Sequence, residues 1–329
     1  MPFRTGYHDG AMKNTHPFRL LCCLFVLCAT AAAAAQDQPQ DKPEDKAYEI
    51  KLARPVKVGM KYALTTDGAL VRETTIKRGA VTQKQPEDGY GVHLEGTVEV
   101  LALDDVGEEA KVSIAVDKCT RITSEGETEL VARGKVLVAE GQGKDTKLTL
   151  KDGGELTKEA TDALELVLSL DTNDKLTDDD LLGTKGRKKV GESWPVTSEN
   201  VAKDSERVGV VVKPGDVEGS FRVDAVEKKD GIECLRLSGN LKVKNLVTRA
   251  DDNEDDGLPE GFVVEGGSME AKYSGLFPVD TSVGSLAESA SMTFVTHVKG
   301  KGGGGGNDVV TVESRVQRAV DMKRRFLEP

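Results

Sequence analysis

Residues 93–114 read HLEGTVEVLALDDVGEEAKVSI, and residues 216–237 read DVEGSFRVDAVEKKDGIECLRL. In each stretch apolar and polar side chains alternate, a glycine-containing turn follows, and a second alternating run returns. This pattern is typical of an antiparallel β-hairpin with one buried face. The stretches align without a gap at a shift of 123 positions. The alignment predicts an internal duplication, although unrelated β-hairpins also share such a pattern.

A shorter phrase precedes each stretch: KVGMKY at residues 57–62 and KVGESW at residues 189–194, at a shift of 132 positions. We interpret each phrase as the turn that opens one structural unit. Gly59 and Gly191 would shape the backbone, because glycine tolerates conformations that other residues resist. Tyr62 and Trp194 would pack at the sheet edge with their polar atoms directed toward a partner.

The rest of the chain after the leader is predicted to be mainly β. The expected strands are residues 62–66, 70–77, 92–103, 110–123, 127–139 and 147–150 in the first half, and 208–212, 219–227, 233–246, 261–277, 287–299 and 309–320 in the second. Valines in the last of these also fit a helical stripe. The run Gly302–Gly306 is expected to form a flexible hairpin tip before it.

One amphipathic helix is expected at residues 156–170, with Thr157 as its N-cap. The predicted fold is two related antiparallel β units that form an open, half-barrel-like curved sheet around this central helix. The expected division is a first β unit at 48–155, a helix and acidic connector at 156–186, a second β unit at 187–322 and a tail at 323–329.

The first 35 residues have the pattern of a signal peptide: a basic stretch, the apolar run 20–29 and an alanine-rich end. Cleavage would leave Gln36 at the N-terminus, followed by a charged, proline-containing flexible lead-in at 36–47. Met12 begins a signal peptide of more ordinary length. We therefore expect an exported protein, periplasmic or extracellular, with no transmembrane segment after cleavage.

Loss of the signal segment removes three basic groups and one acid, so the formal net charge falls from −11 to −13. So acidic a chain repels phosphate backbones, and no basic stripe with interleaved aromatic residues is present. Nucleic-acid binding is not expected, nor is electrostatic docking on anionic lipid.

Two cysteines remain after cleavage, Cys119 and Cys234, one on a predicted strand of each half. In an oxidising compartment they could form a disulfide. They could equally be two small buried residues that never meet, because sequence does not supply their separation.

Catalytic motifs are missing from the sequence. His93 and His297 have no metal-ligand spacing, and no nucleophile elbow, phosphate loop or dinucleotide fingerprint is present. We expect no catalytic residue, metal or cofactor. The acidic loop with Asp252, Glu254 and Asp256 imitates the start of a calcium loop but lacks the acid at its twelfth position, so we favour a solvated acidic loop over a calcium site.

The KVGESW turn together with the late segment YSGLFPVDTSVGSLAESASMTFVTHV (273–298) resembles exported bacterial β-rich proteins that carry a domain of unknown function. More loosely, the chain resembles the periplasmic lipoprotein-carrier fold, an unclosed antiparallel barrel with helices on its concave side. The second resemblance implies an apolar ligand or a lipoprotein in a concave β surface. The alternatives are an envelope module that binds protein partners without a ligand cavity, and a hydrolase with a carboxylate pair. Oligomeric state is left undetermined.

Overall fold

The computed structural model describes residues 46–327 except residues 144, 171, 173–175, 208, 249–261 and 302–308. The predicted signal segment, most of the lead-in and the glycine run at 302–306 lie outside the described residues. The calcium candidate, Asp252, Glu254 and Asp256, lies outside them as well.

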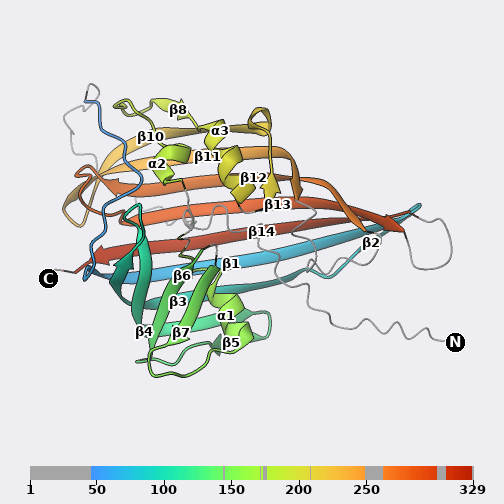
Figure 1. The fold of residues 1–329 in the computed structure, drawn as a ribbon, viewed down its shortest axis with the longest axis horizontal. Coiled ribbons are helices and arrows are strands. Elements are labelled where there is room, and N and C mark those ends of the chain that lie inside the picture. The colour runs from blue at the N-terminus through green and yellow to red at the C-terminus, as the bar shows by residue number, and fades with distance from the viewer. Residues whose placement is uncertain are drawn as a thin grey trace, which may run out of the picture.

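Long strands dominate the described residues (Figure 1). The strands are β1 (Lys61–Arg78), β2 (Val81–Lys84), β3 (Asp88–Leu103), β4 (Glu109–Thr123), β5 (Gly126–Glu129), β6 (Val136–Gln142), β7 (Asp145–Leu150), β8 (Ser193–Pro195), β9 (Val210–Val211), β10 (Val217–Lys229), β11 (Ile232–Thr248), β12 (Val263–Pro278), β13 (Ala287–Lys301) and β14 (Val309–Phe326). The helices are α1 (Lys158–Leu164), α2 (Asp178–Leu182) and α3 (Ser198–Arg207), with a 3₁₀ turn η2 at Pro214–Asp216.

All of these strands belong to one antiparallel sheet, in the order β7-β6-β4-β3-β1-β14-β13-β12-β11-β10-β8. The short strands β2, β5 and β9 pair with β1, β4 and β11. The two ends of the order, β7 and β8, do not pair with each other, so the sheet is open. This confirms the predicted mainly β class with a single open antiparallel sheet.

The two predicted units join in the middle of the sheet, where β14 pairs with β1 over nearly the whole length of both strands, from Tyr62 opposite Phe326 to Arg78 opposite Val310. The ambiguous segment 309–320 is therefore a strand. Val312, Val316 and Val320 lie four residues apart, a spacing that fits both a helix and one face of a strand, so the sequence pattern could not decide between them. β14 continues to Phe326, and the predicted boundary at residue 322 with a tail after it is wrong.

The start of the first predicted unit packs in the second. Tyr48 forms a bridge with Lys188, and Tyr48, Ile50 and Leu52 are buried in the core that contains Trp194. The predicted boundary at residue 48 is therefore misplaced. Local pattern gives no sign of which core a short extended segment joins.

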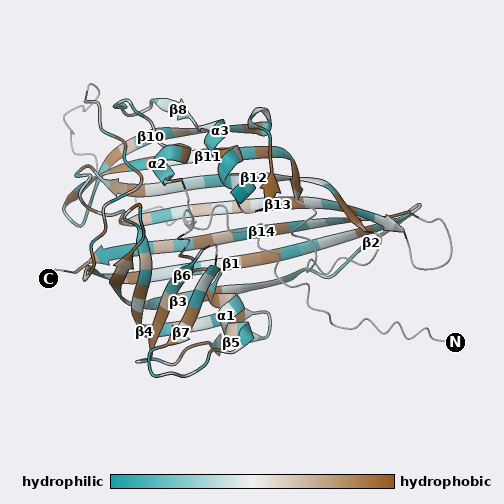
Figure 2. Cartoon of the chain, viewed as in Figure 1, coloured by the Kyte–Doolittle hydropathy of each residue, from teal (hydrophilic) through white to brown (hydrophobic). Residues whose placement is uncertain are grey.

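Alternation divides the sheet into two faces, visible as alternating colours along the strands in Figure 2. We call the face that carries α1, α2 and α3 the inner face. On β3 and β4 its residues are almost fully buried: Val98, Val100, Val112 and Ile114 are each at most 3% exposed. The opposite, outer face is polar and carries ion pairs between neighbouring strands, such as Lys61–Glu99, Lys111–Glu140 and Lys242–Glu270.

The predicted helix at 156–170 is much shorter in the structure. Thr157 caps it as expected, since its hydroxyl accepts a hydrogen bond from Ala160 N at 3.1 Å. α1 nevertheless ends at Leu164, and Arg318 on β14 donates hydrogen bonds to the carbonyls of Glu165 and Leu166 just beyond it. A side chain that satisfies these carbonyls favours the end of the helix there. Two further helices, α2 and α3, were not expected.

Close packing under this turn explains a glycine within β1. A Cβ on Gly68 would lie 2.6 Å from Val167 Cγ1, so only glycine lets the turn after α1 approach the sheet. The sequence pattern split this region into two strands around Gly68. In the structure they are one strand of 18 residues.

The two opening phrases have the same pairing. Gly59 N donates to Val100 O at 2.8 Å, and Gly191 N donates to Val223 O at 2.7 Å. Tyr62 lies opposite Val98 on β3, and Trp194 lies opposite Phe221 on β10. These pairs are related by the two shifts found in the sequence, 132 and 123 positions. Descent by duplication remains a prediction, but the shared register is observed.

The likeness ends at the returning strands. Val100 pairs with Val112, and the gapless alignment would place Leu235 opposite Val223, whereas Leu237 lies there. The loop between β3 and β4 has five residues and the turn between β10 and β11 has two, a difference of three. A β-bulge at Asp224, between Val223 and Ala225, offsets one of these and leaves a shift of two residues. An even offset keeps each side chain on the same face.

Candidate binding face

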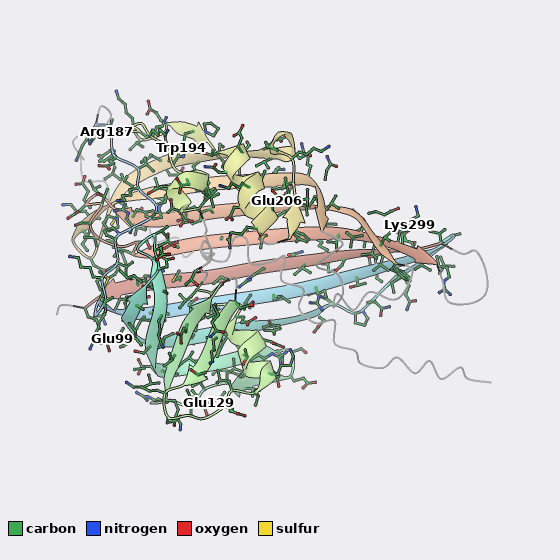
Figure 3. The ribbon with its side chains drawn as sticks, viewed as in Figure 1. Glu99, Glu129, Arg187, Trp194, Glu206 and Lys299 are labelled. Carbon is green, nitrogen blue, oxygen red and sulfur yellow. The ribbon has the colours of Figure 1, made fainter. Side chains whose placement is uncertain are left out.

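The four residues singled out in the opening phrases have backbone and packing roles in the structure. Gly59 and Gly191 have φ of 83° and 86°, the left-handed region that favours glycine. Tyr62 OH lies 3.0 Å from Glu109 Oε1, and Trp194 Nε1 donates to Leu182 O at 2.7 Å. Both rings are buried with their polar atoms paired. Trp194 lies at the edge strand β8 (Figure 3), but Tyr62 lies in the middle of the sheet, contrary to expectation.

The two cysteines do not pair. Cys119 on β4 and Cys234 on β11 are free and buried. Six strand-to-strand steps separate β4 from β11, roughly 29 Å along the sheet. The disulfide alternative is therefore wrong, and the alternative of two separate buried residues holds. Burial raises the pKa of the Cys119 thiol to about 12, so the thiol is protonated and unreactive near neutral pH.

Two large hydrophobic cores cover the inner face, one in each half of the sheet. The second-unit core contains Trp194, Phe221 and Tyr273 with residues of α2 and α3, and the first-unit core contains Leu94, Ile114 and Leu164 of α1. Both are closely filled, with most members under 6% exposed. The inner face is therefore fully covered toward its two ends.

Between the two cores the inner face is only half covered. We call the half-buried apolar side chains of β1 and β14 in this region the central strip: Leu70, Ile76, Val312, Val316 and Val320. Leu70 and Val320 contact the small group of buried residues at α1. The other three belong to no buried cluster of the described residues. The central strip is thus the part of the inner face that a further molecule could cover.

Three arginines lie on the inner face beside the central strip, on three different strands. Register places Leu70 of β1 directly between Arg318 of β14 and Tyr90 of β3. Arg72 follows Leu70 by two residues on the same face. The guanidinium of Arg121, on β4, lies 4.8 Å from the centre of the Tyr90 ring, within the range of a cation–π contact.

We call Arg72, Arg121 and Arg318 with Tyr90 the arginine cluster. Burial raises the pKa of the Tyr90 hydroxyl, and the three arginines oppose this rise through their positive charges. All three guanidinium groups therefore act on one hydroxyl. Tyr90 OH also lies 3.5 Å from Asp162 O, a long contact for a hydrogen bond.

The three arginines differ in how their charges are paired. Arg121 forms an ion pair with Glu159, while its Nε is buried with no hydrogen-bond partner among the described residues. Arg318 donates to the neutral carbonyls after α1. For Arg72, the described part of the chain provides no ion pair or hydrogen bond. Among the described residues, Arg72 is thus the member of the cluster whose charge no carboxylate pairs.

A second polar group lies on the inner face where the two units meet. Arg324 of β14 donates to Ser285 Oγ at 2.7 Å and to Glu288 Oε1 at 3.0 Å, and Ser285 also bonds Glu288. The Arg324 guanidinium lies 5.7 Å from the centre of the Tyr62 ring. We call Tyr62, Glu109, Ser285, Glu288 and Arg324 the junction cluster. It connects strands of both units.

Charge pairing in the junction cluster is strong. Burial raises the pKa of Tyr62, and Glu109 raises it further. Burial lowers the pKa of Arg324, but Glu288, Tyr62 and Glu109 outweigh it, so the pKa lies above the usual value. The Glu288 side chain is 9% exposed and that of Arg324 is 23% exposed. These groups are paired with each other and hold β1 against β13 and β14.

Arg54 connects the N-terminal segment to the same end of the sheet. Its guanidinium donates to the carbonyls of Pro278 and Asp280, both at 3.0 Å, and lies over the Phe277 ring. Burial lowers its pKa, while Asp179 and Asp280 oppose the shift. Its contacts are with backbone carbonyls at the end of β12 and in the loop that follows, which makes its role structural.

A histidine–carboxylate pair that sequence reasoning missed lies on the outer face. His93 Nδ1 is 2.7 Å from Asp67 Oδ1, and His93 Nε2 is 3.8 Å from Glu95 Oε2. Carboxylates therefore flank both ring nitrogens. Among the described residues, no hydroxyl or thiol hydrogen-bonds this imidazole, so the arrangement lacks the nucleophile of a catalytic triad.

The described residues contain no group of three or more His, Cys, Asp or Glu side chains placed to hold a metal ion. No helix among them has both the length and the apolar composition that a membrane span requires.

Comparisons with known proteins give only remote likenesses. No model of a protein family matches this sequence, and no characterised protein sequence matches it. Among solved structures, a lipovitellin structure that reports lipid–protein interactions matches at a TM-score of 0.32 and 9% identity, covering 81% of this chain but 26% of the lipovitellin chain. The attachment invasion locus protein Ail of Yersinia pestis matches at a TM-score of 0.14 and 8% identity, covering 81% of this chain and 99% of Ail. At these scores the likenesses carry no argument about this chain.

The arginine cluster was missed at the sequence level, although a partial signal exists. Arg318 lies between Val316 and Val320, each two residues away, while Arg72 and Arg121 each have one apolar neighbour at that spacing, Leu70 and Cys119. A charge on the buried side of an alternating strand is unusual. What the pattern could not show is that strands from different parts of the chain bring the three together.

Proposed function

We propose that this protein is an exported, non-catalytic envelope protein that holds an apolar ligand against the inner face of its sheet. The observation that carries the proposal is the central strip, a row of half-buried apolar side chains on β1 and β14 between two filled cores. Soluble proteins seldom leave such a row without a function. The signal-peptide pattern of residues 1–35 supports export.

The geometry favours a long, thin ligand. The central strip follows two neighbouring strands that pair over 17 residues, and strand rise is about 3.3 Å per residue. An acyl chain laid along the strands would contact Val312 and Val316 on one strand and Ile76 on the other. A lipoprotein would present the same chemistry through its acyl chains.

The test compares two neighbouring residues of β14 that face opposite ways. The protein carrying its own leader is purified after export, and extracted lipid and binding of a fluorescent fatty acid are measured. We expect Val312→Lys to weaken binding at least tenfold, and Thr311→Lys, on the outer face, to leave it unchanged. Circular dichroism checks that both variants fold. Absence of lipid and of probe binding in the unchanged protein would refute the proposal.

A second candidate function is an interaction module without a ligand cavity. Exposed apolar side chains at the narrow end of the sheet, where Lys299 lies (Figure 3), favour it. Val81, Val263 and Val309 are 68%, 61% and 48% exposed there. Crosslinking in the envelope should then capture a partner that Val81→Asp abolishes. Val58→Asp is the matched control, since Val58 is 62% exposed at the opposite end of β1. Capture that is unaffected by Val81→Asp would count against this candidate.

A further inference from the structure

We propose that the arginine cluster receives the anionic head group of the ligand, so that the ligand class is an acyl chain ending in a carboxylate or phosphate. This inference rests on the proposed function, because it assigns the chemistry of one end of the same ligand. It also differs from what the net negative charge of the chain would suggest. An acidic protein would be expected to repel anions, yet three arginines gather on its inner face.

The first step is the balance of charge. Glu159 neutralises Arg121, and Asp162 is already paired with Lys158. Arg318 donates to the carbonyl oxygens of Glu165 and Leu166, which hold its guanidinium beside the turn after α1. Arg72 lies opposite Asp88 in the sheet, but no ion pair forms between them. A half-buried guanidinium without a counter-ion is costly, and an anion placed beside it lowers that cost.

The hydrogen-bond donors of the arginine cluster are also placed to bind an anion. A carboxylate or phosphate accepts paired hydrogen bonds from a guanidinium, and Arg72 has all of its donors available among the described residues. Arg121 adds a buried Nε without a partner there. The Tyr90 hydroxyl, which makes a long contact to Asp162 O, can donate to the same anion. Donors from three neighbouring strands thus converge beside Leu70.

The third step is the position of the cluster relative to the central strip. Along β14 toward the narrow end, Val316 follows Arg318 by two residues and Val312 by six. Along β1, Ile76 follows Arg72 by four residues in the same direction. From Arg318 to Val310 the strand extends about 26 Å. A head group at the arginines therefore places a single acyl chain along the apolar side chains.

The experiment measures binding of three probes with the same chain: oleate, 1-oleoyl lysophosphatidate and oleyl alcohol. We expect both anions to bind at least tenfold more tightly than the neutral alcohol, with a preference that falls as salt rises. Arg72→Gln should weaken anion binding about fivefold to tenfold and leave the alcohol unchanged. Arg72→Lys should restore most of the loss. Whichever anion binds more tightly identifies the head group as carboxylate or phosphate.

The control is Arg325→Gln, which removes the same charge from an exposed outer-face position of β14. It should leave all three affinities unchanged, and a loss equal to that of Arg72→Gln would show that only net charge matters. Equal binding of anions and alcohol, unaffected by Arg72→Gln, would overturn the inference while the proposed function stands. Binding of none of the probes would overturn both.

Discussion

The two opening phrases begin with the same hydrogen bonds and end in different parts of the sheet. Tyr62 lies near the start of β1, a strand of 18 residues that pairs with β3 on one side and with β14 on the other. After Trp194, β8 stops at Pro195 and forms an edge. Proline has no N–H to donate to a neighbouring strand and is found mainly at sheet edges. A repeated phrase can thus set a local register without setting its place in the sheet.

The surroundings of the two rings differ as well. Trp194 stacks near Phe221 at 6.2 Å and bonds a carbonyl of α2, so it fastens a helix to an edge strand. Tyr62 packs near Phe326 at 5.8 Å and belongs to the junction cluster, so it fastens strands of both units together. The same position therefore serves packing in one unit and a charged network in the other.

The largest expected effect comes from removing the ring at the edge. Trp194→Ala should lower the free energy of unfolding by about 3–5 kcal/mol, because it leaves a cavity and an unpaired Leu182 carbonyl. Trp194→Phe keeps most of the volume and should cost less than half as much. Urea unfolding measures both. Equal losses for the two variants would show that the hydrogen bond, and not the packing, dominates at this turn.

The next largest effect is expected at the junction cluster, the charged network around Tyr62 of the first opening phrase. Glu288→Gln should lower stability by about 2–3 kcal/mol, because it leaves Arg324 without its counter-ion in a largely buried place. Glu270→Gln is the control, since that carboxylate pairs with Lys242 on the exposed outer face. The control should leave stability almost unchanged, because solvent screens an exposed ion pair. A similar small loss for Glu288→Gln would mean that the junction cluster contributes no more than a surface pair.

Tyr62→Phe tests the polar atom of the first turn alone. Loss of the hydrogen bond to Glu109 should cost about 1–2 kcal/mol, while the ring packing is retained. The effect should shrink when Glu109→Gln is already present, because the acceptor is then neutral. Additive losses in a double-mutant cycle would contradict a direct interaction.

The two turn glycines should respond alike. Gly59→Ala and Gly191→Ala should each cost about 1 kcal/mol, because their φ values are positive while no neighbouring atom would clash with a Cβ. Gly186→Ala is the control: it has equally open surroundings without a positive φ, and should have no loss. Clearly different losses at Gly59 and Gly191 would break the equivalence of the two turns.

The smallest effect concerns the buried thiol of the first unit and is absent at neutral pH. The pKa of Cys119 is raised to about 12 from its ordinary value of 9.0, so folding favours the protonated thiol. The folded state should therefore lose stability as pH rises from about 9 toward 12. Cys119→Ala should lose less over the same pH range in urea unfolding. Rapid alkylation of the native protein near pH 8 would contradict a buried, protonated thiol.

Local sequence determined much of this fold. Alternation identified most of the strands and their buried faces, Thr157 was correctly placed as a helix cap, and the two shifts relate positions that have the same pairing in both units. These features depend on neighbours within one hairpin or one helix turn. Side-chain period and turn chemistry carry that information directly.

Only the tertiary structure decided how distant parts combine. It joined β14 to β1, placed residues 48–52 in the second-unit core, ended α1 at the carbonyls to which Arg318 donates, and gathered Arg72, Arg121 and Arg318 around Tyr90. The pairing of strands more than 200 positions apart is set by which buried faces fit together. No local pattern specifies that fit, so the inner-face site became visible only once the sheet was assembled.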